Sequence, residues 1–417
     1  MENTMHMSTH SQTLVTEKPQ ARFGHALVIG SSISGLTAAR VLTEHFERVT
    51  IVDRDGPPEP FEFRRGVPQA RHAHRLLPRG QMILEEQFPG LVDELLALGA
   101  IAIDAEKEVV IDYRGMRHTR RARPQSVTVS CSRALLESTI YRRLASSPGI
   151  HFIQKVEVTG LLVDERHERV TGVRLQCIRC QTTEMELSTD LVVDTSGRNS
   201  KSPQWLEALG YTPPEEWSID SSVGYATRIY ERPADFDVGW DTLYIRPTPP
   251  NGTRGGIIVP IEGNRWHVTL IGVAGDHPPH DHEGFLAFAN SLPTSRLYNA
   301  IKDTKPLSGI SGFHLTANRI RRYDKLPRYL EGFLVYGDAV YIMNPVYAQG
   351  MTAAAVGSQA LDRCLMRQPS GDLMGLSRAF QKQLSLSLGQ LWHTVTSHDW
   401  HWPATTITDN SDRIYPN

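Results

Sequence analysis

The sequence predicts an α/β protein with a three-layer domain, an inserted, mainly antiparallel β-sheet domain and C-terminal helices. Three observations predict this fold class. An apolar strand at 25–29 is followed by a small-residue turn and by apolar residues at helical spacing as far as Phe46. Strands rich in aromatic residues, with alternating side chains at 265–273, dominate 204–312. A small-residue helix at 349–365 and further helical sequence follow towards the C-terminus.

The composition is that of an ordinary globular protein, with 40% hydrophobic and 22% charged residues among 417, and the length allows two domains. The 44 Lys and Arg nearly balance the 46 Asp and Glu, which argues against recruitment by nucleic acid or an anionic membrane. No apolar run approaches the roughly 18 residues of a membrane span. The polar first 22 residues lack the apolar core that a signal peptide needs, and the four cysteines of this long chain lead us to expect a reduced, cytoplasmic setting. We expect a mobile tail at 1–22, a discontinuous nucleotide-binding domain at 23–103, 125–203 and 313–365, a substrate domain at 104–124 and 204–312, and a C-terminal helical region at 366–417.

The first chemical motif is the turn Gly30-Ser-Ser-Ile-Ser-Gly35 between strand and helix. In this context Gly30 makes the tight turn, Gly35 lets helix and strand pack closely, and the helix N-terminus faces a pyrophosphate. Ser32 takes the middle glycine position, where its hydroxyl can donate to phosphate. Asp53 ends the next strand, where a carboxylate accepts hydrogen bonds from ribose hydroxyls and repels a 2′-phosphate. A tight structural turn is the alternative, but the whole unit favours a Rossmann-like nucleotide site.

Two more strand ends stop in acidic, glycine-bearing turns, at 193–200 and at 335–339, and the second is followed by Pro345 and Gly350. With the glycine loop these three motifs, in this order, resemble the flavin-dependent aromatic hydroxylases of the para-hydroxybenzoate hydroxylase type. The resemblance covers about 24 to 365 and implies bound FAD.

The resemblance also implies roles for individual residues. Asp338 would bond the ribityl chain, Pro345 would pack by the flavin ring, and Arg133 would contact the flavin. The Gly350-Met351 backbone at a helix N-terminus would stabilise the negative charge of the reduced ring. The expected cofactor contacts are Gly30, Ser31, Ser32, Ile33, Ser34, Gly35, Asp53, Arg54, Arg65, Arg133, Val158, Asp194, Gly337, Asp338, Pro345, Gln349, Gly350 and Met351.

The stretch 65–80, with its Gly-Val-Pro-Gln-x-x-His-x-His pattern, resembles a narrower subgroup, the bacterial monooxygenases of the polyether-epoxidase kind. The resemblance places His72 and His74 in a loop against the flavin. Alternatively they only hold that loop by hydrogen bonds. They are our weak catalytic candidates beside the flavin itself, since no catalytic triad, paired carboxylates or metal-ligand set stands out. An isolated Cys177-x-x-Cys180 pair lacks the second pair that zinc sites usually need.

Departures from the family pattern limit what the resemblance implies. Two extra residues separate Asp194 from Gly197. That motif is tied to both FAD and NADPH contacts in aromatic hydroxylases, so NAD(P)H is expected as donor either directly or through a flavin reductase. No second glycine loop supports a two-nucleotide reductase, and the Trp-x-Trp-x-Ile-Pro box of flavin halogenases is absent. The tryptophans of 398–403 are instead expected to form a packing or lid element.

The sequence therefore predicts an FAD-dependent monooxygenase, which would hydroxylate or epoxidise a small apolar organic substrate with O₂ through a flavin C4a-hydroperoxide, plausibly in secondary metabolism. One alternative is a flavin-dependent reductase of the polyprenyl-reductase type, which moves hydride. The other is a non-catalytic FAD-binding partner protein. The candidate lining residues of the substrate pocket, each of which could instead be plain core, are Tyr225, Tyr230, Tyr244, Trp266 and Phe313.

Overall fold

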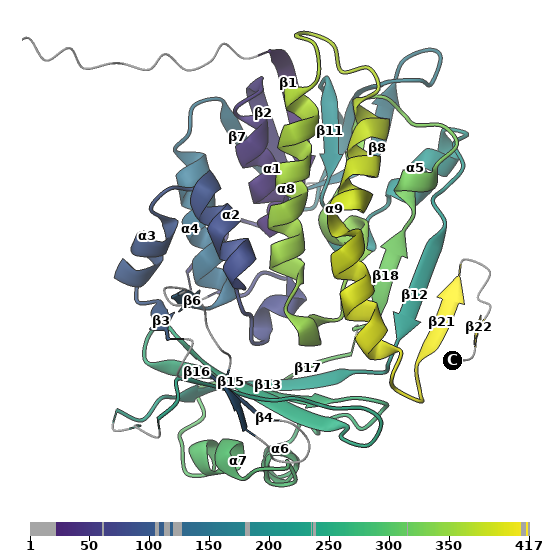
Figure 1. Ribbon diagram of the computed structural model, residues 1–417. Coiled ribbons are helices and arrows are strands. Elements are labelled where there is room, and N and C mark those ends of the chain that lie inside the picture. The colour runs from purple at the N-terminus through teal and green to yellow at the C-terminus, as the bar shows by residue number, and fades with distance from the viewer. Residues whose placement is uncertain are drawn as a thin grey trace, which may run out of the picture.

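The computed structural model describes residues 22–60, 62–104, 108–111, 117–119, 127–179, 184–234, 236, 239–314, 316–409 and 414–415. Apart from residue 22, the predicted tail lies outside these residues, as does Cys180. A tall helix-covered part stands on a sheet that has two further helices beneath it (Figure 1). The predicted fold class is confirmed.

A parallel five-stranded sheet forms the centre of the tall part, in the order β19-β11-β1-β2-β7. Its strands are mostly buried on both faces, which explains their continuous apolar sequence. They are β1 (Phe23–Ile29), β2 (Phe46–Asp53), β7 (Ile150–Gln154), β11 (Leu191–Asp194) and β19 (Phe333–Val335).

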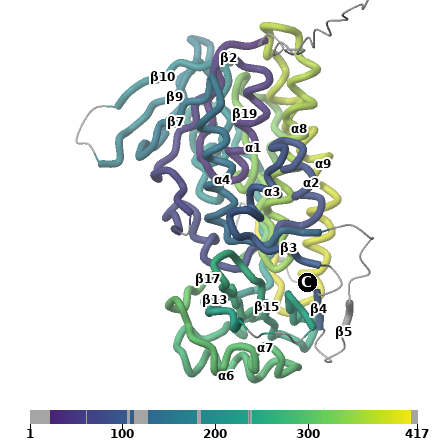
Figure 2. The backbone as a smooth tube through the Cα atoms, turned by 90° about the vertical axis from the view of Figure 1, so that its left-hand side faces the viewer, coloured from purple at the N-terminus to yellow at the C-terminus, as the bar shows by residue number. Residues whose placement is uncertain are grey.

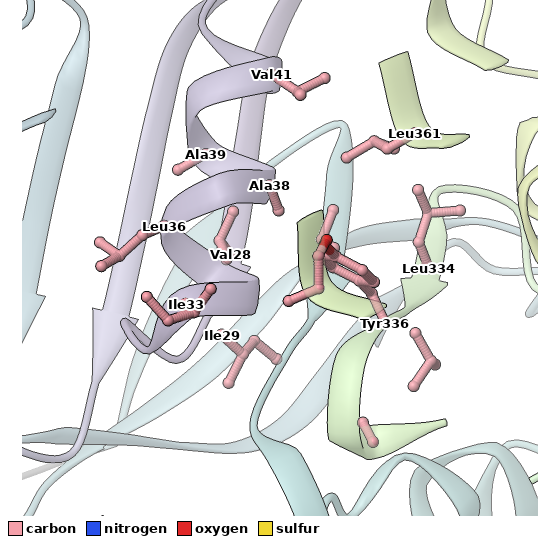
Figure 3. Packing of buried hydrophobic residues seen from close by; sticks show 14 of the residues in the cluster. Val28, Ile29, Ile33, Leu36, Ala38, Ala39, Val41, Leu334, Tyr336 and Leu361 are labelled. Atoms are coloured by element: carbon pink, nitrogen blue, oxygen red, sulfur yellow. The ribbon is translucent and has the colours of Figure 1, made fainter. Parts of the chain in front are cut away.

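Helices and a second small sheet enclose this sheet as outer layers. The helices are α1 (Ile33–Leu42), α2 (Pro78–Gln87), α3 (Leu91–Ala97), α4 (Arg133–Ala145), α8 (Gly350–Met366) and α9 (Leu376–Asp399). The small antiparallel sheet, seen projecting at the side in Figure 2, consists of β8 (Val156–Val163), β9 (Val170–Cys177) and β10 (Met185–Ser188). The core lies where α1 packs between β1 and α8, with side chains such as Val28, Leu36 and Leu361 brought together (Figure 3).

The inserted sheet has seven strands, all antiparallel to their neighbours except β14 and β4, which are parallel. In spatial order they are β17 (Ser311–Phe313), β13 (Gly224–Glu231), β16 (Arg265–Gly272), β15 (Arg254–Ile261), β14 (Thr242–Ile245), β4 (Glu108–Ile111) and β5 (Arg117–Thr119). The helices α6 (His282–Asn290) and α7 (Arg296–Ile301) cover its outer face, as Figures 1 and 2 show.

A fourth sheet joins the C-terminal end of the chain to the rest. Its strands are β20 (Tyr341–Ile342), β18 (Asn318–Arg321), β12 (Glu216–Asp220), β21 (Thr406–Asp409) and β22 (Ile414–Tyr415). The remaining short elements are β3 (Ile101–Ile103), β6 (Thr128–Ser130) and α5 (Ser202–Ala208). The predicted helical region beyond 366 is thus helical to Asp399 and then adds strands, because β21 pairs with the exposed edge of β12.

The segment 78–97 forms two helices, α2 and α3, because Pro89 and Gly90 interrupt it and Gly90 has a φ of +78°. Among the described residues no helix is long and apolar enough to cross a membrane. Nor do these residues include a group of three or more His, Cys, Asp or Glu side chains arranged to hold a metal ion.

Candidate cofactor site

The glycine loop has the backbone that the sequence predicts. Gly30 has a φ of +99°, which favours glycine. A Cβ on Gly35 would lie 1.8 Å from the carbonyl oxygen of Gly30 and 2.8 Å from Thr195 Oγ1, so no other residue fits there. Helix α1 therefore begins directly at the carboxyl ends of β1 and β11, the edge at which open α/β sheets bind ligands.

A cavity of about 110 Å³ opens at this edge. Six of the predicted cofactor contacts line it, namely Gly30, Ser31 and Ser32 of the loop, Asp53 and Arg54 at the end of β2, and Val158 from β8. Its lining residues are Ile29, Gly30, Ser31, Ser32, Val52, Asp53, Arg54, Asp55, Arg64, Gly66, Val67, Val156, Glu157, Val158, Thr195, Ser196, Asn199, Lys201 and Trp205. Arg65 is exposed and absent from this lining, and the neighbouring Arg64 takes the place predicted for it.

The Asp53 carboxylate is fixed at the cavity wall. Its Oδ2 accepts hydrogen bonds of 2.6 Å from both the amide and the hydroxyl of Ser31, and its Oδ1 accepts one of 2.7 Å from the amide of Asp55. Arg64 lies 3.5 Å from Oδ2. A ribose at this wall would bond to Oδ1, which accepts only one of these hydrogen bonds and has a second lone pair.

An ion network that the sequence analysis missed lies at the N-terminus of α1. The Glu137 carboxylate accepts from Ile33 N (3.2 Å), from the Ser32 hydroxyl, from Arg133 Nε (2.9 Å) and from Arg64 Nη2 (2.9 Å). Burial would raise the pKa of Glu137, but the charges of Arg133 and Arg64 with the Ser32 hydrogen bond outweigh it and hold the pKa at about 2. Arg64 is shared between Glu137 and Asp53, so two guanidinium groups balance two carboxylates beside the loop.

Asp338 forms the second half of the site, in a 3-10 turn (η5, Gly337–Ala339) that follows β19. Gly337 packs against Ser34 of the glycine loop, where a Cβ would come within 2.3 Å of the Ser34 hydroxyl. The half-buried Asp338 carboxylate accepts no hydrogen bond from the described residues. Burial raises its pKa, although Arg133, Arg198 and Arg319 lower it. Its acceptor oxygens are therefore free for a ligand's hydroxyl groups.

Asp194 has a different position from the one predicted. Its carboxylate is fully buried and accepts from the amide of Ser196 (2.8 Å) and from the hydroxyls of Ser200 (2.5 Å) and Ser202. These bonds fold the turn that follows β11 back on itself. Asp194 thus shapes the loop that supplies Ser196 and Asn199 to the cavity, while its own oxygens are occupied.

The start of α8 leaves space for a planar ring. Pro345 and Gly350 are exposed, and an added Cβ on Gly350 would meet no atom within 4 Å. Between them Ala348 has a φ of +53°, while Gln349 is half-buried and Met351 is buried at the first turn of α8. The free acceptors of Asp338 and this open helix start fit the ribityl chain and ring of FAD, which these residues with the 110 Å³ cavity would hold.

The aromatic candidates on the inserted sheet divide between its two faces. Tyr225, Tyr244 and Phe313 lie on the face turned towards the parallel domain, in or against a cluster with Trp402 and Val346. Tyr230 and Trp266 lie in the core under α6, with Phe285 and Phe236. The reason is the period of two in a strand, which puts Tyr225 and Tyr230 of β13 on opposite faces.

The histidines meet on the inner face of the sheet. The buried His72 contacts Thr227 Oγ1 through Nδ1 at 2.8 Å, and Thr227 bonds Thr269 at 2.7 Å. His72 Nδ1 therefore ties its loop to β13, as the structural interpretation expects, while its ring lies 5.3 Å from that of Phe313. His74 Nδ1 donates to the His72 carbonyl oxygen at 3.0 Å.

His267, on β16, is the residue of this group that the sequence analysis missed. It is buried, and its Nε2 has no hydrogen-bond partner among the described residues. Burial, with His74 and His72 nearby, lowers the pKa of His267 to about 3, and burial lowers that of His72 to about 4. The alternation of Trp266 and His267 was the signal for it, since only one of the two can face the cofactor domain.

Comparison with known proteins agrees with this geometry. A family model described as "FAD binding domain" matches residues 25–371. Protein Rv3254 of Mycobacterium tuberculosis is 33% identical over 407 residues, which cover 92% of this chain and 85% of that protein.

Solved structures of flavoenzymes have a similar fold. The flavin-dependent brominase Bmp2 has a TM-score of 0.62 at 16% identity, over 90% of this chain and 89% of that one. The p-nitrophenol 4-monooxygenase PnpA from Pseudomonas putida has a TM-score of 0.61 at 14% identity, over 91% and 89%. PqsL, a probable FAD-dependent monooxygenase from Pseudomonas aeruginosa, has a TM-score of 0.60 at 17% identity, over 90% and 94%. At these identities the likeness shows the fold alone.

Proposed function

This chain belongs to the FAD binding domain family, and on that premise we propose that it is an FAD-dependent monooxygenase that adds one oxygen atom to a small apolar organic substrate. The reaction would be a hydroxylation or an epoxidation, in the cytoplasm and in secondary metabolism. NAD(P)H would supply the electrons, directly or through a flavin reductase.

One observation carries the proposal. The aromatic inner face of the inserted sheet borders the turn assigned to the flavin ring, because Tyr225, Tyr244 and Phe313 share one cluster with Val346 of the turn η6 (Pro345–Tyr347). Trp402, from the C-terminal segment, is buried in the same cluster. An apolar substrate held against these rings would lie next to the cofactor and away from water, as oxygen transfer requires.

The bound flavin would supply the activation of O₂ and the transfer of oxygen. The chain's own residues would prepare the site for it. Asp338 would accept hydrogen bonds from the ribityl hydroxyls, and the amides at the start of α8 would stabilise the negative charge of the reduced ring. Arg64 and Arg133 would bind the pyrophosphate beside Glu137.

The histidines act in this proposal as neutral hydrogen-bonding groups. With pKa values of about 4 and about 3, His72 and His267 carry no charge near neutral pH. Thr227 and Thr269 hold His72 in place. His267 Nε2 is left to bond a polar group of the substrate or the flavin, which would orient the apolar molecule over the ring.

The first experiment is an anaerobic reduction of the purified FAD protein with NADH and NADPH, followed near 450 nm (roughly, for any oxidised flavin), and then admission of air. Rapid bleaching and a transient blue-shifted oxygen adduct support a monooxygenase that takes electrons directly. If neither donor bleaches the flavin, added flavin reductase with NADH should do so before air is admitted.

Labelled O₂ then separates the proposal from its rivals. With a pool of apolar alkenes and phenols as probes, the label should enter a product. Reduction of an alkene without label would instead identify a hydride-transferring reductase. A bound flavin that neither donor, reductase nor dithionite reduces would contradict any redox function.

A further inference from the structure

A second cavity, of about 640 Å³, lies at the opposite end of the parallel sheet from the cofactor site. Glu331 at its wall precedes β19, and Asp338 of the cofactor site follows the same strand. The cavity therefore opens at the amino end of β19, beside the start of α9. Its lining residues are Asp324, Lys325, Leu326, Pro327, Arg328, Tyr329, Glu331, Met374, Gly375, Arg378 and Lys382.

Four cations line this cavity without a salt bridge to any described residue: Lys325, Arg328, Arg378 and Lys382. The two acids of the lining are engaged elsewhere. Asp324 accepts two hydrogen bonds of 2.9 Å from Arg322, and Glu331 accepts one of 3.0 Å from the amide of Gly375. The lining therefore carries four cations against two acids, a net positive charge.

This placement of charge is unfavourable for the fold itself. Arg378 and Lys382 are four residues apart on one side of α9, where like charges repel. Arg378 lies in the first turn, where the helix dipole disfavours positive charge, and no acidic residue occupies that turn. An anion between these side chains would remove both penalties.

The lining also contains groups for the rest of a ligand. The Tyr329 hydroxyl is shielded from solvent and has no hydrogen-bond partner among the described residues. Leu326, Pro327 and the exposed Met374 add apolar surface. A volume of 640 Å³ is typical of small-molecule sites.

We propose that this cavity binds a small organic anion that carries two or more phosphate charges, such as a nucleoside diphosphate, at a site separate from the FAD site. Arg378 can pair a phosphate through two parallel N–H groups, and the lysines add point charges. The Arg328 guanidinium lies 3.9 Å from the centroid of the Tyr211 ring, a cation–π contact that holds it in place.

The test uses the purified FAD-loaded protein at low salt, with inorganic pyrophosphate and adenosine diphosphate as probes in calorimetric titrations. The double variant Arg378→Ala/Lys382→Ala should weaken binding of the better probe by about tenfold or more, because two charge-assisted contacts are lost. Its FAD content should equal that of the wild type. Removing two repelling charges should leave the fold intact, which circular dichroism checks.

The matched control is Arg296→Ala/Lys302→Ala, which removes two exposed cations from α7 and its C-terminal end. It should bind the probe like the wild type. If both double variants bind the probe equally weakly, the loss reflects only the change in net charge, and the proposal is overturned. So would a wild type that binds neither probe at millimolar concentration, or a probe that only displaces FAD. Tighter binding of adenosine diphosphate than of pyrophosphate would identify the ligand as a nucleotide. Equal binding of the two probes would show that the site recognises only the phosphate groups.

Discussion

Glu137 and Asp338 are both carboxylates that lie near arginines. They differ in whether groups of the protein already donate hydrogen bonds to them. Four donors from Ser32, Ile33, Arg133 and Arg64 surround Glu137, whereas Asp338 accepts no hydrogen bond from the described part of the chain. Glu137 therefore stabilises the loop, and Asp338 is left for a ligand.

Replacing Asp338 with Ala should strip FAD from the protein, because ribityl hydroxyls would lose a charged acceptor and Arg198 and Arg319 a counter-charge. The measurement is the ratio of flavin to protein absorbance after purification. Asp190→Ala, which removes a carboxylate that bonds His25 far from the cavity, is the control and should retain flavin. Wild-type FAD occupancy in Asp338→Ala would mean that the ribityl chain binds elsewhere.

The lowered pKa of Glu137 should make the free energy of unfolding depend on pH. Its pKa is about 2 in the folded protein and 4.5 as the reference value, so its contribution is complete above pH 4.5 and is lost as the pH falls towards 2. That contribution is on the order of 3 kcal/mol. Denaturant unfolding at pH 7 and at pH 3 should show that Glu137→Gln is less stable than the wild type at pH 7, by a margin that narrows at pH 3. A constant margin would contradict the ionised network.

At the scale of single elements, the sequence predicted those features that depend on residues close together in the chain. The glycine loop, the first βαβ unit and the acidic strand ends follow from residues close together in the chain. The aromatic content did not show which face of the inserted sheet turns towards the cofactor domain. Trp266 was therefore chosen as a pocket residue, and His267 was overlooked. Arg65 was chosen over Arg64 because a loop has no period from which to infer direction. Glu137 was missed although Arg133 and Glu137 are spaced as a helical ion pair.

Strand β16 offers a matched pair of variants. Trp266→Ala should cost about 3–5 kcal/mol of unfolding free energy, because it empties a fully buried site under α6, and should leave the flavin spectrum unchanged. His267→Phe keeps the bulk of the ring and removes the free Nε2. It should shift the flavin spectrum or its rate of reduction while costing less stability than Trp266→Ala. Identical effects of the two would place both side chains in the core.

At the scale of the whole molecule, helix α9 joins the C-terminal region to the cofactor turn. The buried Asp399 at its end accepts hydrogen bonds from Asn318 Nδ2 (2.5 Å), Asn344 Nδ2 (3.1 Å) and the Tyr347 hydroxyl (2.6 Å). Asn344 in turn caps the turn that contains Pro345. These contacts are far apart in sequence, so no local pattern could have predicted them.

Replacing Asp399 with Ala should leave three buried donors without an acceptor, at a cost of about 1–3 kcal/mol each before relaxation. Because two of the three, on Asn344 and Tyr347, flank the turn assigned to the flavin ring, FAD affinity should fall together with stability. Leu386→Ala on the same helix is the control, since Leu386 is 78% exposed and should change neither quantity. Fluorescence titration of the apoprotein with FAD, beside thermal unfolding, measures both. Lower stability with unchanged FAD affinity would show that α9 supports the fold without holding the cofactor turn.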